Sequence, residues 1–304
     1  MVFAAFALVG RRLRRWRDDF AMKTFGLALT AAAVALTLLT PLAARAQTAA
    51  SEWMQGNSSR IRLIAGKIEP AGPIVAGVQI ELDDGWKTYW RNPGDAGGVP
   101  PELDWSASAN LVKSELTFPA PTRLRDVTGE NIGYKHGVML PVVLQPADPA
   151  QPIRLDLKIM FGVCQKICIP EERHLTLTLD PKAGADQDIA ALLAQAVATV
   201  PVDPAKTAKA PQIQAIKLDT AAGKPSILIA TTFPAGSDGA DLFVESSEGS
   251  YLPMTEKLAD SGDGSVKFRI DLSKTDDFKS PSGKSLKFTL VSKAGASESI
   301  RVLP

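Results

Sequence analysis

Two cysteines, Cys164 and Cys168, are the only ones in the chain and stand four residues apart. A disulfide that closes so short a loop removes little entropy from the unfolded chain, so it is a weak structural staple. In an extended strand the two Cα atoms would lie about 13 Å apart, whereas a disulfide needs about 7 Å or less. The chain must therefore turn between them. Turn-borne disulfides are open to thiol exchange, so redox exchange and a structural bridge both remain possible on this chemistry alone.

A soft-metal site is the third interpretation of these residues. Its ligands would be the two cysteines and His174, joined by His136 or Met160, a set that copper(I) accepts. The chain has only two histidines, and the spacing of a four-ligand zinc site is absent. We therefore expect neither a metal nor a cofactor at the cysteines.

Alternating apolar residues on both sides of the cysteines predict a β-hairpin. Apolar side chains occupy every second position of 153–161 and of 175–179, which is the period of a strand with one buried face. A helix is disfavoured, because the period is two and Pro170 lies just beyond the second cysteine. We therefore expect the cysteine pair at or near the tip of the hairpin.

The rest of the chain predicts an all-β protein. Short alternating runs, broken by Gly, Pro, Asp and Asn, continue from Ile61 and indicate antiparallel strands. The predicted fold is an immunoglobulin-like β-sandwich that carries the cysteine hairpin, followed by a second, smaller β-sandwich-like domain. Strands of the second domain are expected at 227–232, 242–246, 266–272 and 286–291.

The domain boundaries follow from changes of composition. An Ala- and Leu-rich stretch, 189–200, predicts a connecting helix, and three prolines between 201 and 211 indicate a linker. The expected parts are a first domain (47–182), a helix and linker (183–211) and a second β-domain (212–304).

The N-terminus predicts export. A basic segment precedes an apolar run at 25–39, and Ala44-Arg45-Ala46 is a signal-peptidase site. We therefore expect a cleavable signal peptide over 1–46, with Met22 as an alternative translation start after 1–21, and a periplasmic mature chain. An uncleaved anchor is the alternative, but the apolar run is shorter than the roughly 20 residues that span a bilayer. The mature chain is not expected to be embedded in the membrane.

The charge of the mature chain argues against polyanionic partners. The segment 1–46 holds seven Lys/Arg and two Asp/Glu, so its removal changes the net charge from +1 to −4. A mildly acidic protein is poorly suited to nucleic acid or to anionic lipid. We expect no nucleic-acid partner.

Four runs of the sequence, taken together, resemble a known family. They are 85–97 (GWKTYWRNPGDAG), 133–134 (GY), 140–142 (LPV) and 163–170 (VCQKICIP). Over about residues 53–180 the chain resembles the N-terminal periplasmic domain of the DsbD and ScsB thiol-disulfide reductases. The resemblance implies an immunoglobulin-like sandwich whose cysteines pass electrons from a membrane reductase to periplasmic thioredoxin-fold proteins. It also implies that Cys168 forms the mixed disulfide and that Cys164 resolves it.

The resemblance further indicates which residues surround the cysteines. A loop that caps the cysteines in the family corresponds to 125–128, where Asp126 and Val127 replace the typical aromatic residues. Tyr89, Trp90 and Tyr134 are candidates for the edge of the site, although core packing is the ordinary role of such aromatics.

The membrane and terminal thioredoxin domains of the full-length reductases have no counterpart here, so the expected electron source is a separate membrane thiol reductase. The alternative function is a non-catalytic periplasmic adaptor or copper-tolerance protein with a structural disulfide.

Overall fold

The structure is a computed structural model that describes residues 49–69, 72–126, 129–219, 225–278 and 280–304. The expected signal peptide (1–46) and Val127 of the expected cap lie outside the described residues. In the described part, no helix is long and apolar enough to cross a membrane.

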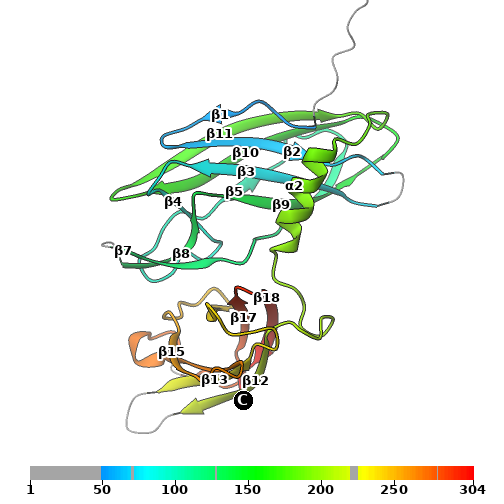
Figure 1. Cartoon of the computed structure of the whole chain (residues 1–304). Helices are drawn as coiled ribbons and strands as arrows, with labels where there is room; N and C mark the ends of the chain where they lie inside the picture. The colour runs from blue at the N-terminus through cyan, green and yellow to red at the C-terminus, as the bar shows by residue number, and fades with distance from the viewer. Residues whose placement is uncertain (1–48, 70–71, 127–128, 220–224, 279) are drawn as a thin grey trace, which may run out of the picture. The chain divides into compact units, whose positions relative to one another are not determined.

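The first sandwich consists of two antiparallel sheets (Figure 1). The two sheets share one apolar core. The first sheet has the order β1 (Met54–Gln55), β2 (Ser59–Ala65), β3 (Ile74–Leu82), β9 (Gly137–Pro146) and β6 (Leu111–Leu116). The second has the order β11 (Cys168–Leu179), β10 (Ile153–Cys164), β4 (Lys87–Tyr89), β8 (Gly129–Lys135) and β7 (Thr122–Asp126), with β5 (Glu102–Asp104) paired to β10. The expected all-β sandwich is confirmed.

The cysteine hairpin is formed by β10 and β11. These strands pair without a register shift from Ile153 opposite Leu179 to Cys164 opposite Cys168. On β10 the apolar residues, from Ile153 to Val163, are buried at every second position and belong to the core, as the period of a strand requires. The Cα atoms of the two cysteines lie 4.2 Å apart, so the chain turns between them as expected.

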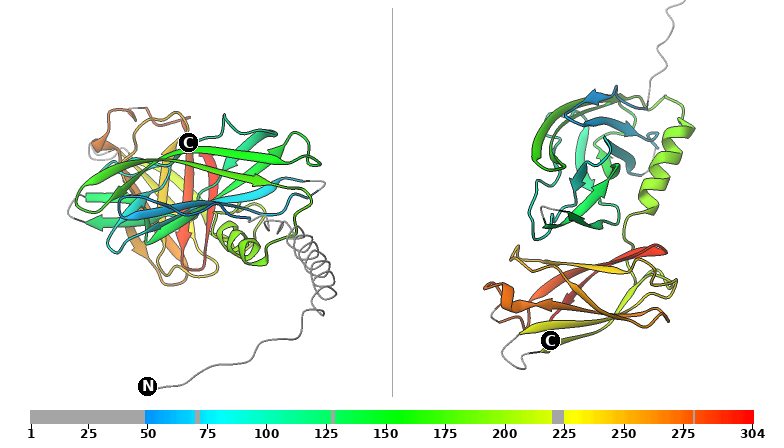
Figure 2. Two further views of the ribbon diagram at one scale, coloured as in Figure 1. Left: turned by 90° about the horizontal axis from the view of Figure 1, so that it is seen from above. Right: turned by 60° about the vertical axis from the view of Figure 1, so that its left-hand side comes forward.

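The helix α2 (Gln187–Ala198) packs on the first sandwich. Asp186 caps it by accepting from the backbone N–H groups of residues 188 and 189. Its buried residues Ile189 and Leu193 cluster with Ile64 of β2, so the helix covers the outer face of the sheet that contains β2, β3 and β9 (Figure 2). The helix predicted as a connector is therefore also part of the packing of this sandwich.

The second sandwich also contains two antiparallel sheets. One has the order β12 (Gln212–Asp219), β13 (Ser226–Thr232), β16 (Ser265–Asp271) and β15 (Glu256–Asp260), and the other has the order β14 (Asp241–Ser246), β17 (Ser285–Ser292) and β18 (Gly295–Val302). A 3-10 turn, η2 (Leu272–Lys274), follows β16. The four strands predicted here are found. Strands β12, β15 and β18 were not predicted, because most of their residues are exposed or only half-buried.

Candidate functional site

Cys164 and Cys168 form a disulfide at the tip of the hairpin. Their environments differ: Cys164 is 1% exposed, whereas Cys168 is an exposed residue. An attacking thiolate needs access to a sulfur atom as well as a suitable leaving group. A protein thiol that approaches from outside therefore has access to Cys168 rather than to Cys164.

The hydroxyl group of Tyr89 contacts both sulfur atoms. Its Oη lies 2.8 Å from Sγ of Cys164 and 3.0 Å from Sγ of Cys168. Strand β4 brings it there, because Lys87 is the register partner of Cys164 and successive side chains of a strand point to opposite faces. Lys87 and Tyr89 thus share the outer face of the sheet with Cys164.

The Tyr89 ring lies in a slot that two glycines make possible. A Cβ atom on Gly98, whose φ is +154°, would lie 2.3 Å from Cε1 of Tyr89, and one on Gly162 would lie 3.2 Å from Cε2. The N–H of Gly162 donates to the carbonyl oxygen of Val99 at 2.9 Å, so the loop that follows β4 folds over the ring. The result is a tyrosine that is only 1% exposed on the outer face of a sheet.

Tyr89 is suited to donate a hydrogen bond. Burial, and then the negative charge of Asp126, raise the pKa of Tyr89 above its ordinary value. The phenol therefore stays protonated at neutral pH, and its O–H can donate to a thiolate that forms when the disulfide is reduced. Hydrogen bonds to a charged acceptor are the stronger kind, so this contact favours the thiolate.

A buried polar network lies beside Tyr89. Lys87 is 4% exposed, and its Nζ donates to Oδ2 of Asp126 at 2.6 Å and to Oδ1 of Asn131 at 2.5 Å. The amide nitrogen of Asn131 donates in turn to the carbonyl oxygen of Gly97 at 2.7 Å. The network connects β4, the end of β7, β8 and the loop that covers Tyr89.

Two of the aromatic residues predicted at the edge of the site face the other way. Trp90 is fully buried in the core, with its ring centroid 5.9 Å from that of Phe243. Tyr134 is buried in the same core, where its hydroxyl donates to the carbonyl oxygen of Pro119 at 2.9 Å. Both sit on the inner face because their positions alternate with those of the outer-face residues. Of the three predicted aromatics, the structure brings Tyr89 to the cysteines.

Lys87, Asn131 and Gly98 were missed by the reasoning from sequence. The sequence carries only a weak indication that these residues belong to the site. Lys87 precedes Tyr89 by two positions and so had to share its face, but a lysine in a short polar run is ordinarily an exposed one.

The copper(I) ligand set predicted as a third option is not assembled. His174 lies six residues along β11 from Cys168, which is about 20 Å in a strand, and its Nε2 lies 2.5 Å from Oδ1 of Asp156. The neighbouring Arg173 forms an ion pair with Glu171, in which Nη2 and Oε2 lie 2.9 Å apart. Across the described ranges no group of three or more His, Cys, Asp or Glu residues is placed to hold a metal.

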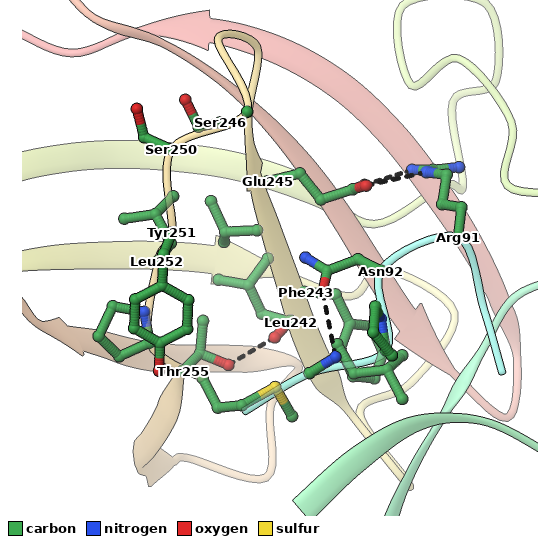
Figure 3. A pocket seen from close by; sticks show the side chains of 17 residues that line it. Arg91, Asn92, Leu242, Phe243, Glu245, Ser246, Ser250, Tyr251, Leu252 and Thr255 are labelled. Atoms are coloured by element: carbon green, nitrogen blue, oxygen red, sulfur yellow. Dashed lines mark hydrogen bonds and ion pairs between the residues drawn. The ribbon is translucent and has the colours of Figure 1, made fainter. Parts of the chain in front are cut away.

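A cavity of about 400 Å³ opens elsewhere, between the loop after β4 and the segment from β14 to Thr255 (Figure 3). Arg91 and Glu245 point toward each other at one side of it, with Nη2 and Oε2 2.6 Å apart. Neither cysteine lines this cavity, so it is separate from the cysteine site.

The comparisons with known proteins agree with the resemblance seen in the sequence. Residues 63–180 match the family model described as the N-terminal domain of the thiol:disulfide interchange protein DsbD. A search of curated proteins finds no significant match.

The solved structures that match the chain include N-terminal domains of ScsB and DsbD. The N-terminal periplasmic domain of ScsB from Proteus mirabilis is 21% identical, with a TM-score of 0.66, over 84% of this chain and 99% of that one. The N-terminal domain of DsbD from Neisseria meningitidis, in its reduced form, is 13% identical, with a TM-score of 0.24, over 40% of this chain and 84% of that one. The first shows a common fold. The family model matches the segment that carries the cysteine hairpin, residues 63–180.

Proposed function

We propose that this protein exchanges disulfides with thioredoxin-fold proteins of the periplasm through Cys164 and Cys168. The observation that carries the proposal is the unequal exposure of the two cysteines at a hairpin tip, with the Tyr89 hydroxyl group within hydrogen-bond distance of both sulfurs. The match of residues 63–180 to the family model of the N-terminal domain of a thiol:disulfide interchange protein supports it. A purely structural disulfide requires neither an exposed sulfur atom nor a buried phenol beside it.

The exchange has two steps, which we write in the reductive direction. In the dithiol form, the thiolate of Cys168 attacks one sulfur of the partner's disulfide, and the partner's other sulfur leaves as a thiolate. The thiolate of Cys164 then attacks Sγ of Cys168, which breaks the mixed disulfide. The products are the Cys164–Cys168 disulfide and a partner dithiol, so two electrons pass to the partner. A separate membrane thiol reductase would restore the dithiol by the same chemistry.

Trapping the mixed disulfide tests the proposal. Cys164→Ala removes the resolving thiol, so Cys168 should hold a thioredoxin-fold partner in a stable adduct that migrates more slowly on a non-reducing gel. Cys168→Ala is the matched control and should trap nothing. Mass spectrometry identifies the partner. Trapping that persists without Cys168 would reverse the two roles, and the absence of adducts from both folded variants would support the structural bridge.

The reduction potential separates exchange from the alternative of a non-catalytic adaptor or copper-tolerance protein. Structural disulfides of exported proteins have potentials below about −300 mV, and exchangeable ones lie above. Equilibration of the purified protein with glutathione buffers should give a value in the higher range.

Export by a cleavable signal peptide belongs to the same proposal. It is supported by the Ala44-Arg45-Ala46 site and by the structural likeness to a periplasmic domain. The intact mass of protein recovered from the periplasm should correspond to a chain that starts at Gln47. A mass that includes 23–46 would contradict cleavage.

A further inference from the structure

The network beside Tyr89 contains a lysine in an unusual place. Lys87 is almost fully buried, and burial of an ammonium group is costly unless the charge is paired. Its Nζ is paired with the carboxylate of Asp126 at 2.6 Å. The lysine of this pair is buried and the aspartate is partly exposed. Such a pair contributes little to stability compared with apolar residues of similar volume, so stability alone does not explain why a lysine occupies this position.

The position of the pair relates it to the cysteines. Lys87 stands opposite Cys164 in the ladder between β4 and β10, and directly paired residues of an antiparallel ladder have Cβ atoms about 5 Å apart on the same face. Asp126 lies close enough to Tyr89 for its charge to act on the phenol. The phenol in turn contacts both sulfurs. The carboxylate and the sulfurs therefore share one partly dehydrated site.

Reduction of the disulfide adds negative charge to this site. A thiolate at either cysteine would be opposed by the carboxylate of Asp126 if that charge were not compensated. Inside a protein such repulsion is stronger than in water, because the effective dielectric constant is lower.

We propose that Lys87 is a positioning residue of the exchange site, whose ammonium group neutralises Asp126 and so allows the nucleophilic thiolate to form. The inference rests on the proposed function, since it concerns the nucleophile of that reaction. It assigns Lys87 a part in setting thiolate reactivity through Asp126, with Tyr89 between the carboxylate and the sulfurs.

The surrounding ionisable groups define the controls. Packed elements place Lys87 and Tyr89 of β4, Asp126 of β7 and Lys135 of β8 around the site, and Lys166 lies in the turn between the cysteines. Lys135 is the register partner of Lys87 across the β4–β8 ladder and is exposed. Lys135→Met therefore removes an equal charge from a neighbouring position, where solvent already screens that charge.

The test is the pH dependence of iodoacetamide alkylation of the reduced protein, which requires no redox partner. Lys87→Met should move the alkylation profile to higher pH and slow the reaction about tenfold at pH 7, the size of a one-unit change in a neighbouring-charge effect. Lys135→Met should leave the profile in place. The double variant Lys87→Met/Asp126→Asn should restore the profile of the unaltered protein.

The outcomes separate this inference from the proposed function. An unchanged profile in a folded Lys87→Met variant would overturn it, and so would a shift that the second substitution fails to reverse. If Lys87→Met does not fold, Asp126→Asn alone decides: removal of the carboxylate should move the profile to lower pH, and no movement would overturn the inference. Partner trapping by Cys164→Ala is measured independently. The failure of the proposed function and the failure of the inference about Lys87 can therefore be distinguished.

Discussion

Tyr89 is the side chain that connects the cysteine pair to the rest of the sandwich. Its ring is enclosed by Gly98 and Gly162, and its hydroxyl contacts the sulfur atoms of the buried and the exposed cysteine. A phenol held in this way does not have to be ordered when the thiolate forms, so its hydrogen bond costs little conformational entropy at that moment.

Tyr89→Phe should weaken the nucleophile and leave the fold intact, because the phenyl ring still fills the slot. A hydrogen bond to a charged group contributes about 1.5–3 kcal/mol, so alkylation of the reduced variant at pH 7 should slow by about tenfold or more. Tyr134→Phe is the control: it removes the bond to Pro119 on the inner face and should lower stability without changing alkylation. Equal alkylation rates for the two variants would show that the Tyr89 hydroxyl group has no part in thiolate formation.

Gly98→Ala tests the slot itself. The added Cβ would lie 2.3 Å from the Tyr89 ring at a φ of +154°, so the loop or the ring must move. Overpacking of this kind costs about 1–3 kcal/mol, which urea denaturation would measure, and the displaced hydroxyl group should slow alkylation as well. Gly184→Ala, where no atom lies within 4 Å of the new Cβ, should change neither quantity.

The sequence predicted the two cysteines and offered Tyr89, Trp90 and Tyr134 equally as candidates for the edge of the site, without separating Tyr89 from the two core residues. The reason is the length of β4, which has only three residues. So short a strand shows no alternation from which inner and outer faces could be distinguished. Lys87 was missed for a different reason, since its burial depends on Asp126 and Asn131, which lie on other strands.

At the scale of elements, the sequence predicted strands correctly where the alternation of apolar and polar residues continued over many neighbouring positions. The alternation in β10 and β11 extends over twelve-residue strands, so their hairpin and the turn at the cysteines followed from the sequence. Edge strands such as β15 bury little and carry no comparable pattern. The helix α2 was predicted, but its packing was not, because the sheet face that it covers consists of strands more than forty residues earlier in the chain.

Leu193→Ala should loosen α2 from the sheet. Leu193 is 3% exposed and clusters with Ile64 and Ile189, and truncation of such a residue costs about 2–5 kcal/mol. In limited proteolysis of the unaltered protein, cleavage between 183 and 211 should fall outside α2. The Leu193→Ala variant should open sites inside the helix, whereas Val197→Ala, on its exposed side, should not. Early cleavage inside α2 of the unaltered protein would contradict the packing described here.

At the scale of the whole molecule, the loop after β4 connects the first sandwich to the second through ion pairs. Arg91 follows Tyr89 by two residues, and its guanidinium group donates to Glu245 of β14 and to Glu298 of β18. The Arg91 guanidinium also lies 4.1 Å from the centroid of the Trp90 ring. Sequence alone could not reveal this connection, because the partners are separated from Arg91 by more than 150 residues.

This ion pair predicts a pH-dependent part of the stability. Burial alone would raise the pKa of Glu298, but the charge of Arg91 and its hydrogen bond outweigh burial and hold that pKa below its ordinary value. A carboxylate with a depressed pKa stabilises the folded state above its unfolded-state pKa of about 4.3. That contribution is lost as the pH falls through the lower folded-state value.

Arg91→Met should therefore lower the free energy of unfolding at pH 7 by about 1–3 kcal/mol, the cost of leaving a partly buried charged partner without its hydrogen bond. The difference from the unaltered protein should narrow as the pH falls below the unfolded-state pKa of about 4.3 and through the lower folded-state pKa of Glu298, because that carboxylate becomes protonated. Urea denaturation at pH 7, 5 and 3.5 measures it. Arg60→Met breaks a pair with Glu81 in which both side chains are more than a third exposed, and it should cost at most about 1 kcal/mol. A difference between Arg91→Met and the unaltered protein that stayed constant from pH 7 to 3.5 would show that Arg91 stabilises by packing on Trp90 rather than through the carboxylates of the second sandwich.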